Sequence, residues 1–320
     1  MPRSGSAWTG VGAVVAKETA DHLSGILIVL VEALVFLTAL YAVYNAIQDI
    51  RSAIGESRFL FLLLFTVAPQ QVPFSFMDLL GILVPVLAIV LGFDAINGEL
   101  NRRTMSRVLS QPIYRDALLL GKFLSGLLTL TIAFVSLWLL VIGLGLLLLG
   151  VPPSSEECLR MLGYLVATIL YGGVWLAIAM LFSVWFRAPT AAVLAALGLW
   201  LLFLLFWSVI TPIFATMIAG PPQTMFGINL HYIEAQQALS RISPSTLYGQ
   251  AAAALLDPST RSTGILLVTP GVARSMVRNA PLPVSQSFIL VWPQFAAMIA
   301  AMMVIFVISY ISFQRQEIRA

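Results

Sequence analysis

Six long apolar runs limit what this chain can fold into more than any other feature of its sequence. Several of them exceed the ~20 apolar residues that a helix needs to cross the hydrocarbon core of a bilayer. Apolar residues make up 60% of the chain, against roughly 45–50% in soluble domains. The short alternating segments of a transmembrane barrel are absent from the sequence. We therefore expect an all-α polytopic membrane protein, with spans at about residues 25–47, 79–97, 118–150, 159–183, 190–213 and 288–312.

Basic residues predict how these spans are oriented. Six spans bring both termini to one side of the membrane, and that side carries ten of the 17 Lys and Arg residues, against seven on the other side. Four of those seven lie in one long segment, about 214–287, and long loops count little for orientation. We expect a multi-pass protein of the cell (inner) membrane with both termini in the cytoplasm.

The polar stretches between the spans suggest how the chain is divided. The segment at 214–287 contains Ser243-Pro244 and Asp257-Pro258, where proline would break it into short amphipathic helices. We expect it to form a structured cap on the outer membrane surface. The predicted parts are an amphipathic elbow helix region at 1–24, five spans within 25–213, the external segment at 214–287, and the last span with its cytoplasmic tail at 288–320.

Charge is concentrated between Asp94 and Lys122, in the stretch DAINGELNRRTMSRVLSQPIYRDALLLGK. Its closing Gly-Lys pair is also found at the end of a phosphate-binding loop. A true loop of that kind begins with a glycine five residues earlier and continues with Ser or Thr, whereas this chain has Asp116 and Phe123 at those positions. We therefore expect no direct binding of ATP or Mg²⁺ and no ATP hydrolysis by this chain alone.

The middle of this stretch has the pattern of a short amphipathic helix. Met105, Val108 and Leu109 fall on one face, with arginines around the others. The helix must end near Pro112, because the residue before a proline avoids the α region. The sequence predicts a helix at about 99–112 that either docks a cytoplasmic partner or binds membrane lipid headgroups, at ~1 kcal/mol per basic residue.

Several motifs together resemble the type-2 ABC exporter permeases. GFDAINGEL…RVLSQPIYRDALLLGK resembles the family's second-helix and coupling-helix signature, and AKETADHL resembles its N-terminal elbow helix. RISPSTLYG is similar to the Ser-Pro-x-x-x-Tyr motif of the last external loop, and LPVSQSFILVWPQF to the closing helix. The shape FDAI-x-GE…PI-x-R…LLGKF also resembles that of the NosY subgroup, the permeases of nitrous-oxide-reductase maturation transporters.

The resemblance implies a transmembrane permease subunit that couples ATP hydrolysis by a separate ATPase subunit to export or to mechanical transmission. It also implies a second permease copy, as a homodimer, with ATP and Mg²⁺ held by the ATPase. Glu99 would make a charge contact at the hinge, with Asp94 or nearby arginines as partners. The implied coupling residues are Asp94, Glu99, Arg102, Arg103, Arg107, Pro112, Arg115 and Lys122, with Lys17 and Glu18 on the elbow helix.

Glu32 is an isolated carboxylate within the first span. Such a group costs several kcal/mol in a bilayer and marks a cavity, a polar partner or a proton step. The other interpretation is a protonated or hydrogen-bonded glutamate packed against another helix. Catalysis would need several converging groups, so we predict no catalytic residue and no metal ligand.

Two other functions remain open. One is a membrane scaffold for the maturation of a periplasmic protein, with a copper protein among the candidates, and the other is an intramembrane enzyme. The net charge of +3 is small and its basic residues are scattered, so nucleic acid is not an expected partner.

Overall fold

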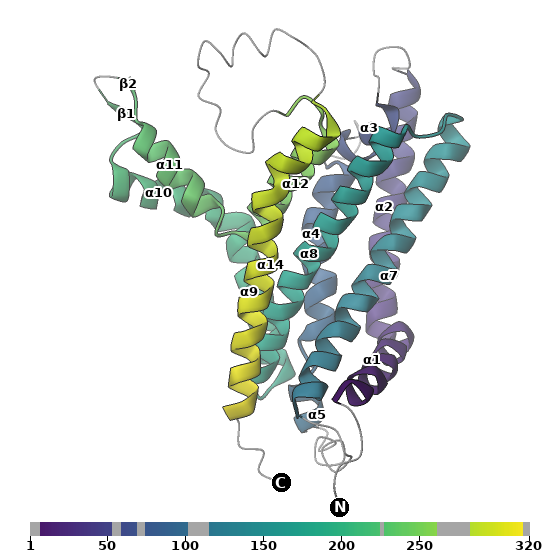
Figure 1. The fold of residues 1–320 in the computed structure, drawn as a ribbon, viewed down its shortest axis with the longest axis vertical. Helices are drawn as coiled ribbons and strands as arrows, with labels where there is room; N and C mark the ends of the chain where they lie inside the picture. Colours follow the sequence, from purple (N-terminus) through teal and green to yellow (C-terminus); the bar gives the residue numbers. More distant parts are fainter. Residues whose placement is uncertain are drawn as a thin grey trace, which may run out of the picture.

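Six long apolar helices dominate the structure, a computed structural model that describes residues 7–52, 59–68, 74–101, 115–224, 227–260 and 282–315 (Figure 1). Within these residues, the helices that are long and apolar enough to cross a membrane cover Ile26–Ile50, Phe76–Asn101, Asp116–Leu149, Ser155–Trp185, Pro189–Ala219 and Val284–Arg315. The all-α fold with six spans is therefore confirmed. The described part of the expected coupling helix ends at Asn101.

Short elements lie between and beside the spans. The elements, in chain order, are α1 (Ala7–Ser24), α2 (Ile26–Ser52), α3 (Leu60–Thr66), α4 (Phe76–Gly92), α5 (Asn97–Asn101), α7 (Arg115–Leu149), α8 (Ser155–Trp185), α9 (Pro189–Leu201), η1 (Leu202–Phe206), α10 (Trp207–Ala219), β1 (Gln223–Thr224), β2 (Gly227–Ile228), α11 (Leu230–Ser240), α12 (Pro244–Leu256) and α14 (Val284–Arg315). The two strands pair antiparallel as a minimal hairpin.

Helix α8 is the centre of the bundle and packs against α4, α7, α9, α12 and α14. Glycines allow two of these neighbours to come very close. A Cβ added at Gly92 of α4 would lie 2.8 Å from the Ala179 Cβ, and one at Gly126 of α7 would lie 2.9 Å from Leu176. Small residues at crossings are the usual way in which membrane helices gain van der Waals contact.

The bundle has two distinct ends (Figure 1). Helices α1 and α5 and the last turn of α14 lie at one end, here called the α1 end. Helix α3 lies at the other, the α3 end. Helix α1 does not cross the bundle but packs against α7.

The fifth span is not one straight helix. Between α9 and α10 lies the π-helical turn η1, in which the N–H of Trp207 donates to the carbonyl of Leu202. Figure 1 shows α10 and α11 leaving the bundle as a pair, with β1 and β2 at their tip. Asn229 holds this pair together by donating from Nδ2 to the Ala219 carbonyl at 2.7 Å.

The segment expected to form a surface cap differs from that expectation. Helices α11 and α12 do separate at Ser243-Pro244, and α12 ends at Leu256, before Pro258. However, α12 packs against α8 and α14, and Ala251, Ala254 and Leu255 are completely buried. The alanines of α12 present almost no bulk, so neighbouring helices approach it from more than one side.

Candidate functional site

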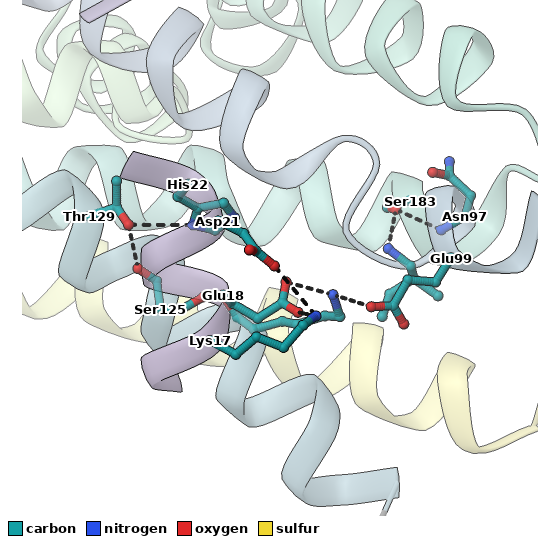
Figure 2. A network of polar contacts seen from close by, with 11 residues as sticks. Lys17, Glu18, Asp21, His22, Asn97, Glu99, Ser125, Thr129 and Ser183 are labelled. Carbon is teal, nitrogen blue, oxygen red and sulfur yellow. Dashed lines mark hydrogen bonds and ion pairs between the residues drawn. The ribbon is translucent and has the colours of Figure 1, made fainter. Parts of the chain in front are cut away.

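Lys122 joins three elements at the α1 end. Its ammonium lies 2.8 Å from Glu18 Oε2 on α1 and 2.8 Å from Glu99 Oε1 on α5. The Lys122 side chain is 5% exposed, and those of Glu18 and Glu99 are 12% and 16% exposed. Figure 2 shows the two glutamates reaching toward each other from their separate helices. Because a buried charge is costly unless it is paired, this Lys122 junction holds α1, α5 and α7 together.

The local sequence explains why α1 and α7 meet here. Val11, Val14, Glu18 and His22 recur at three- and four-residue intervals, so they share one face of α1. Both valines are buried, and a Cβ at Gly121 of α7 would lie 2.6 Å from Val14 Cγ1. The missing side chain of Gly121 therefore lets α1 settle on α7 directly beside Lys122.

Burial and charge act in opposite directions on Glu18. Burial alone would raise the pKa of Glu18, but the Lys122 ammonium and the hydrogen bond from Lys17 outweigh it, and the pKa lies below its ordinary value. The hydrogen bond to Glu18 in turn raises the pKa of Lys17. Glu18 is therefore held as a carboxylate between two ammonium groups.

His22 makes a second polar contact between α1 and α7. Its Nδ1 lies 3.4 Å from Thr129 Oγ1, and the Thr129 hydroxyl donates to the Ser125 carbonyl at 2.9 Å (Figure 2). Burial lowers the pKa of His22 below its ordinary value of 6.5, in spite of the nearby carboxylates. The ring is therefore neutral near pH 7.

Helix α5 is also attached to the end of α8. The backbone N–H groups of Ile96 and Asn97 both donate to Ser183 Oγ, at 2.9 and 3.2 Å (Figure 2). Two asparagine side chains on α5 complete the attachment, because Asn97 donates to the Phe186 carbonyl and Asn101 to that of Arg187. These residues were not predicted as site residues, although Asn97 and Asn101 lie four residues apart at a span end, a spacing that places them on one helix face.

A cleft of about 580 Å³ opens beside the junction, between α1, the start of α2 and the end of α4. One wall is charged, with Asp21 and Asp94 beside the junction residues, and the other is apolar, with Ile26 and Val90 among its side chains. Within the part of the chain that the structure describes, the Asp94 carboxylate makes no hydrogen bond or ion pair, whereas the Asp94 backbone carbonyl accepts from the Gly98 N–H at 3.0 Å. Asp94 is therefore available to a ligand.

The structure thus brings together Lys17, Glu18, Asp94, Glu99 and Lys122, which the sequence analysis named separately. Glu99 contacts Lys122, a pairing that the sequence did not indicate. Arg115 is the first residue of α7, and nothing is described of its side chain. The remaining named residues, Arg102, Arg103, Arg107 and Pro112, lie outside the described residues.

Glu32 is not part of the junction. It lies on α2, one helical turn beyond Ile28, which lines the cleft. Its Oε1 atom is enclosed and has no hydrogen-bond partner among the described residues.

A second buried cation lies at the α3 end. Arg160 of α8 is fully buried and pairs with Glu156 of its own helix at 3.1 Å. Its guanidinium also donates to Ser287 Oγ at 2.9 Å, to the Leu255 carbonyl at 3.2 Å and to the Leu282 carbonyl. These contacts, here called the Arg160 clamp, tie α8 to α12 and α14. In the sequence, Arg160 is one of the seven basic residues expected on the external side, and nothing there indicates that it is buried.

Tyr248, the last residue of the Ser-Pro-x-x-x-Tyr motif, has a packing role. Its ring stacks on Tyr171 with centroids 4.5 Å apart, and its hydroxyl donates to Tyr164 Oη at 2.7 Å. The Tyr171 hydroxyl donates to the Gly81 carbonyl at 3.0 Å. The motif therefore links α12, α8 and α4 inside the bundle.

Comparisons with known proteins agree with this architecture. A family model described as ABC-2 family transporter protein matches residues 12–318, nearly the whole chain. Two curated relatives are each named a probable ABC transporter permease protein NosY. The protein from Pseudomonas aeruginosa is 36% identical over 148 residues, which cover 44% of this chain and 51% of the relative. The protein from Stutzerimonas stutzeri is 32% identical over 152 residues, or 46% of this chain and 52% of the relative. The chain thus spans about half the length of the curated relatives it matches.

Proposed function

The chain belongs to the ABC-2 family of transporter proteins, and on that premise we propose that it couples ATP hydrolysis by a separate ATPase subunit to export or to mechanical transmission across the membrane. The Lys122 junction is the observation that carries this proposal. It connects α1 to α5 and α7, the two helices that flank residues 102–114 in the chain, and the coupling helix predicted at about 99–112 falls largely within that stretch.

The junction provides a physical route for coupling. A push on residues 102–114 reaches α5 and α7 directly, because these helices flank that stretch in the chain. Lys122 passes the displacement to α1 through Glu18, and Ser183 passes it to α8 through the α5 backbone. Small shifts at such a contact can be amplified into helix tilting, since packed interfaces switch between discrete arrangements.

The assembly that we propose is a homodimer of this chain in the cell membrane, with the α1 end and both termini in the cytoplasm. Broad apolar faces of α2 and of the fifth span remain exposed, including Leu34 and Leu37 on α2 and Leu205 and Phe206 on η1. In the proposed assembly, lipid and the second copy cover these faces. ATP and Mg²⁺ belong to the ATPase. A periplasmic partner would contact the α3 end or the α10–α11 pair.

The test is capture of the tagged full-length chain from native membranes in mild detergent, with mass spectrometry and an ATP hydrolysis assay. We expect a P-loop ATPase to be recovered and to hydrolyse ATP. Glu99→Lys should abolish most of this turnover, since it places a second ammonium against Lys122. Glu234→Lys, the same exchange at an exposed position of α11, is the matched control and should leave turnover unchanged.

Other outcomes would overturn the proposal. Recovery of the chain without an ATPase in several detergents would remove the coupling role. An ATPase that is recovered with Glu99→Lys and turns over at the normal rate would show that the Lys122 junction does not transmit the signal.

A further inference from the structure

Among the residues that the structure describes, the lining of the cleft beside the Lys122 junction has a surplus of negative charge. Four carboxylates line it, from Glu18, Asp21, Asp94 and Glu99, against the ammonium groups of Lys17 and Lys122. Both lysines are already engaged: Lys122 pairs with two glutamates, and Lys17 lies 3.0 Å from Glu18 and 3.5 Å from Asp21. The cleft therefore favours a cationic group over an anionic one.

The other wall of the cleft faces the hydrocarbon side. Val90, Leu91 and Phe93 line it from α4, and Ile26 and Leu27 line it from the start of α2. Ile26 is 79% exposed and Leu27 49% exposed. Exposed apolar residues of this kind at a span end meet acyl chains in a membrane. A ligand that fills the cleft must then be charged at one end and apolar at the other.

The depth of the cleft matches a lipid headgroup. Its lining residues lie where the spans Ile26–Ile50 and Phe76–Asn101 begin and end at the α1 end, which is the level of the polar interface. Its volume, about 580 Å³, is within the ~300–1,000 Å³ of small-molecule sites.

We propose that this cleft binds a membrane lipid with a primary ammonium headgroup, such as phosphatidylethanolamine, whose N–H groups donate to Asp94 while an acyl chain lies along Ile26 and Leu27. A primary ammonium offers both a charge and N–H donors, and such charge-assisted hydrogen bonds are the stronger kind. A choline headgroup has the charge without donors, and a glycerol headgroup has no cation. The site goes beyond the coupling function, because it needs neither an ATPase nor ATP.

The test is native mass spectrometry of the full-length chain, without ATPase or ATP, titrated in turn with phosphatidylethanolamine, phosphatidylcholine and phosphatidylglycerol. We expect phosphatidylethanolamine to bind most tightly. Asp94→Asn keeps the size of the side chain but removes its charge, and should weaken phosphatidylethanolamine binding about tenfold. Asp94→Glu should retain most of the binding.

Asp116→Asn is the matched control, since Asp116 is an exposed carboxylate at the same end that accepts a hydrogen bond from Gln314 outside the cleft. It should leave the lipid preference unchanged. Equal binding of the three lipids would overturn the proposal. So would an unchanged lipid preference in an Asp94→Asn variant that elutes as a folded species. Dodecylammonium tests whether a soluble ammonium compound is the ligand instead of a lipid. Displacement of bound phosphatidylethanolamine by dodecylammonium supports the site. Binding of dodecylammonium without any binding of phosphatidylethanolamine overturns the lipid assignment.

Discussion

The two ends of the bundle each bury a basic side chain, but they surround it differently. Lys122 at the α1 end contacts two carboxylates that come from two other helices. Arg160 at the α3 end contacts one carboxylate, from its own helix, and neutral oxygens on the chain segments around α12 and α14. Lys122 therefore joins helices by charge, whereas Arg160 joins them by directed hydrogen bonds.

This difference follows from the chemistry of the two side chains. A guanidinium is a planar fork whose donors fit several acceptors at fixed angles, while an ammonium is a compact point charge on a flexible stem. When the surrounding helices shift, an ammonium loses less interaction energy than a guanidinium does, because it can follow a moving carboxylate. The α3 end is then suited to hold its helices in place, and the α1 end to let helices shift while they stay connected.

The largest effect should come from breaking the Arg160 clamp. Arg160→Met leaves the acceptors at Ser287, Leu255 and Leu282 without their donor, and the Glu156 carboxylate without its partner. We expect the free energy of unfolding to fall by about 3 kcal/mol, measured by chemical denaturation in detergent. Arg160→Lys keeps the charge without the fork and should recover only part of it. Full recovery by lysine would show that charge alone holds this end.

Removing the Lys122 ammonium should lower stability less than removing the Arg160 guanidinium does, and should lower ATP turnover more. Lys122→Met leaves Glu18 and Glu99 facing each other, but both are partly exposed and can turn toward water. We expect a smaller loss of stability, about 1–2 kcal/mol, together with at least a tenfold loss of ATP turnover in the complex. The comparison fails if Lys122→Met destabilises as much as Arg160→Met while turnover per folded complex is kept.

The two carboxylates of the Lys122 junction should compensate for each other. Glu18→Gln and Glu99→Gln each leave Lys122 one charged partner, so either alone should cost about 1 kcal/mol. The double variant leaves the buried ammonium with no charged partner among the described residues and should cost more than the sum of the single variants, since contacting residues are coupled. The double-mutant cycle measures this excess, and strict additivity would mean that the two ion pairs act independently.

The smallest effect expected is a pH dependence confined to the α1 end. The pKa of His22 is lowered in the folded chain, so protonation of His22 favours a state in which α1 is detached from α7. The packing of α1 on α7 therefore loses stability as the pH falls below the ordinary histidine value of 6.5. Hydrogen exchange, corrected for its intrinsic rate, should show weaker protection of α1 than of α12 at pH 5.5 relative to 7.5. His22→Gln should remove this difference; a difference that persists would assign it to another group.

Sequence reasoning found the spans but not the contacts between them. Continuous apolar length suffices to identify a span, whatever its partners are. The pairing of Glu18 with Lys122 joins positions 104 residues apart, and it depends on the fit of Val14 over Gly121, which no local pattern encodes. Glu18, Glu99 and Lys122 were named through the family resemblance, which selects residues without pairing them.

Arg160 and Ser183 were missed for a related reason. Counting basic residues for orientation treats every arginine as solvated, so a fully buried one cannot be recognised in that way. Ser183 lies within an apolar span, where a hydroxyl usually bonds to its own helix. Here it accepts from the backbone of α5 instead.

The π-helical turn η1 keeps the second half of the fifth span in phase with the first. Its i→i+5 bonding accommodates one residue more than an α-helical turn, so the extra residue is absorbed within Leu202–Phe206. Thr211 and Ala215 form the buried face of α10; in a continuous α-helix the extra residue would rotate α10 by about 100° and turn both away from their present neighbours. A single codon deletion within η1 would therefore restore α-helical bonding and still leave the α10–α11 pair facing as it does now.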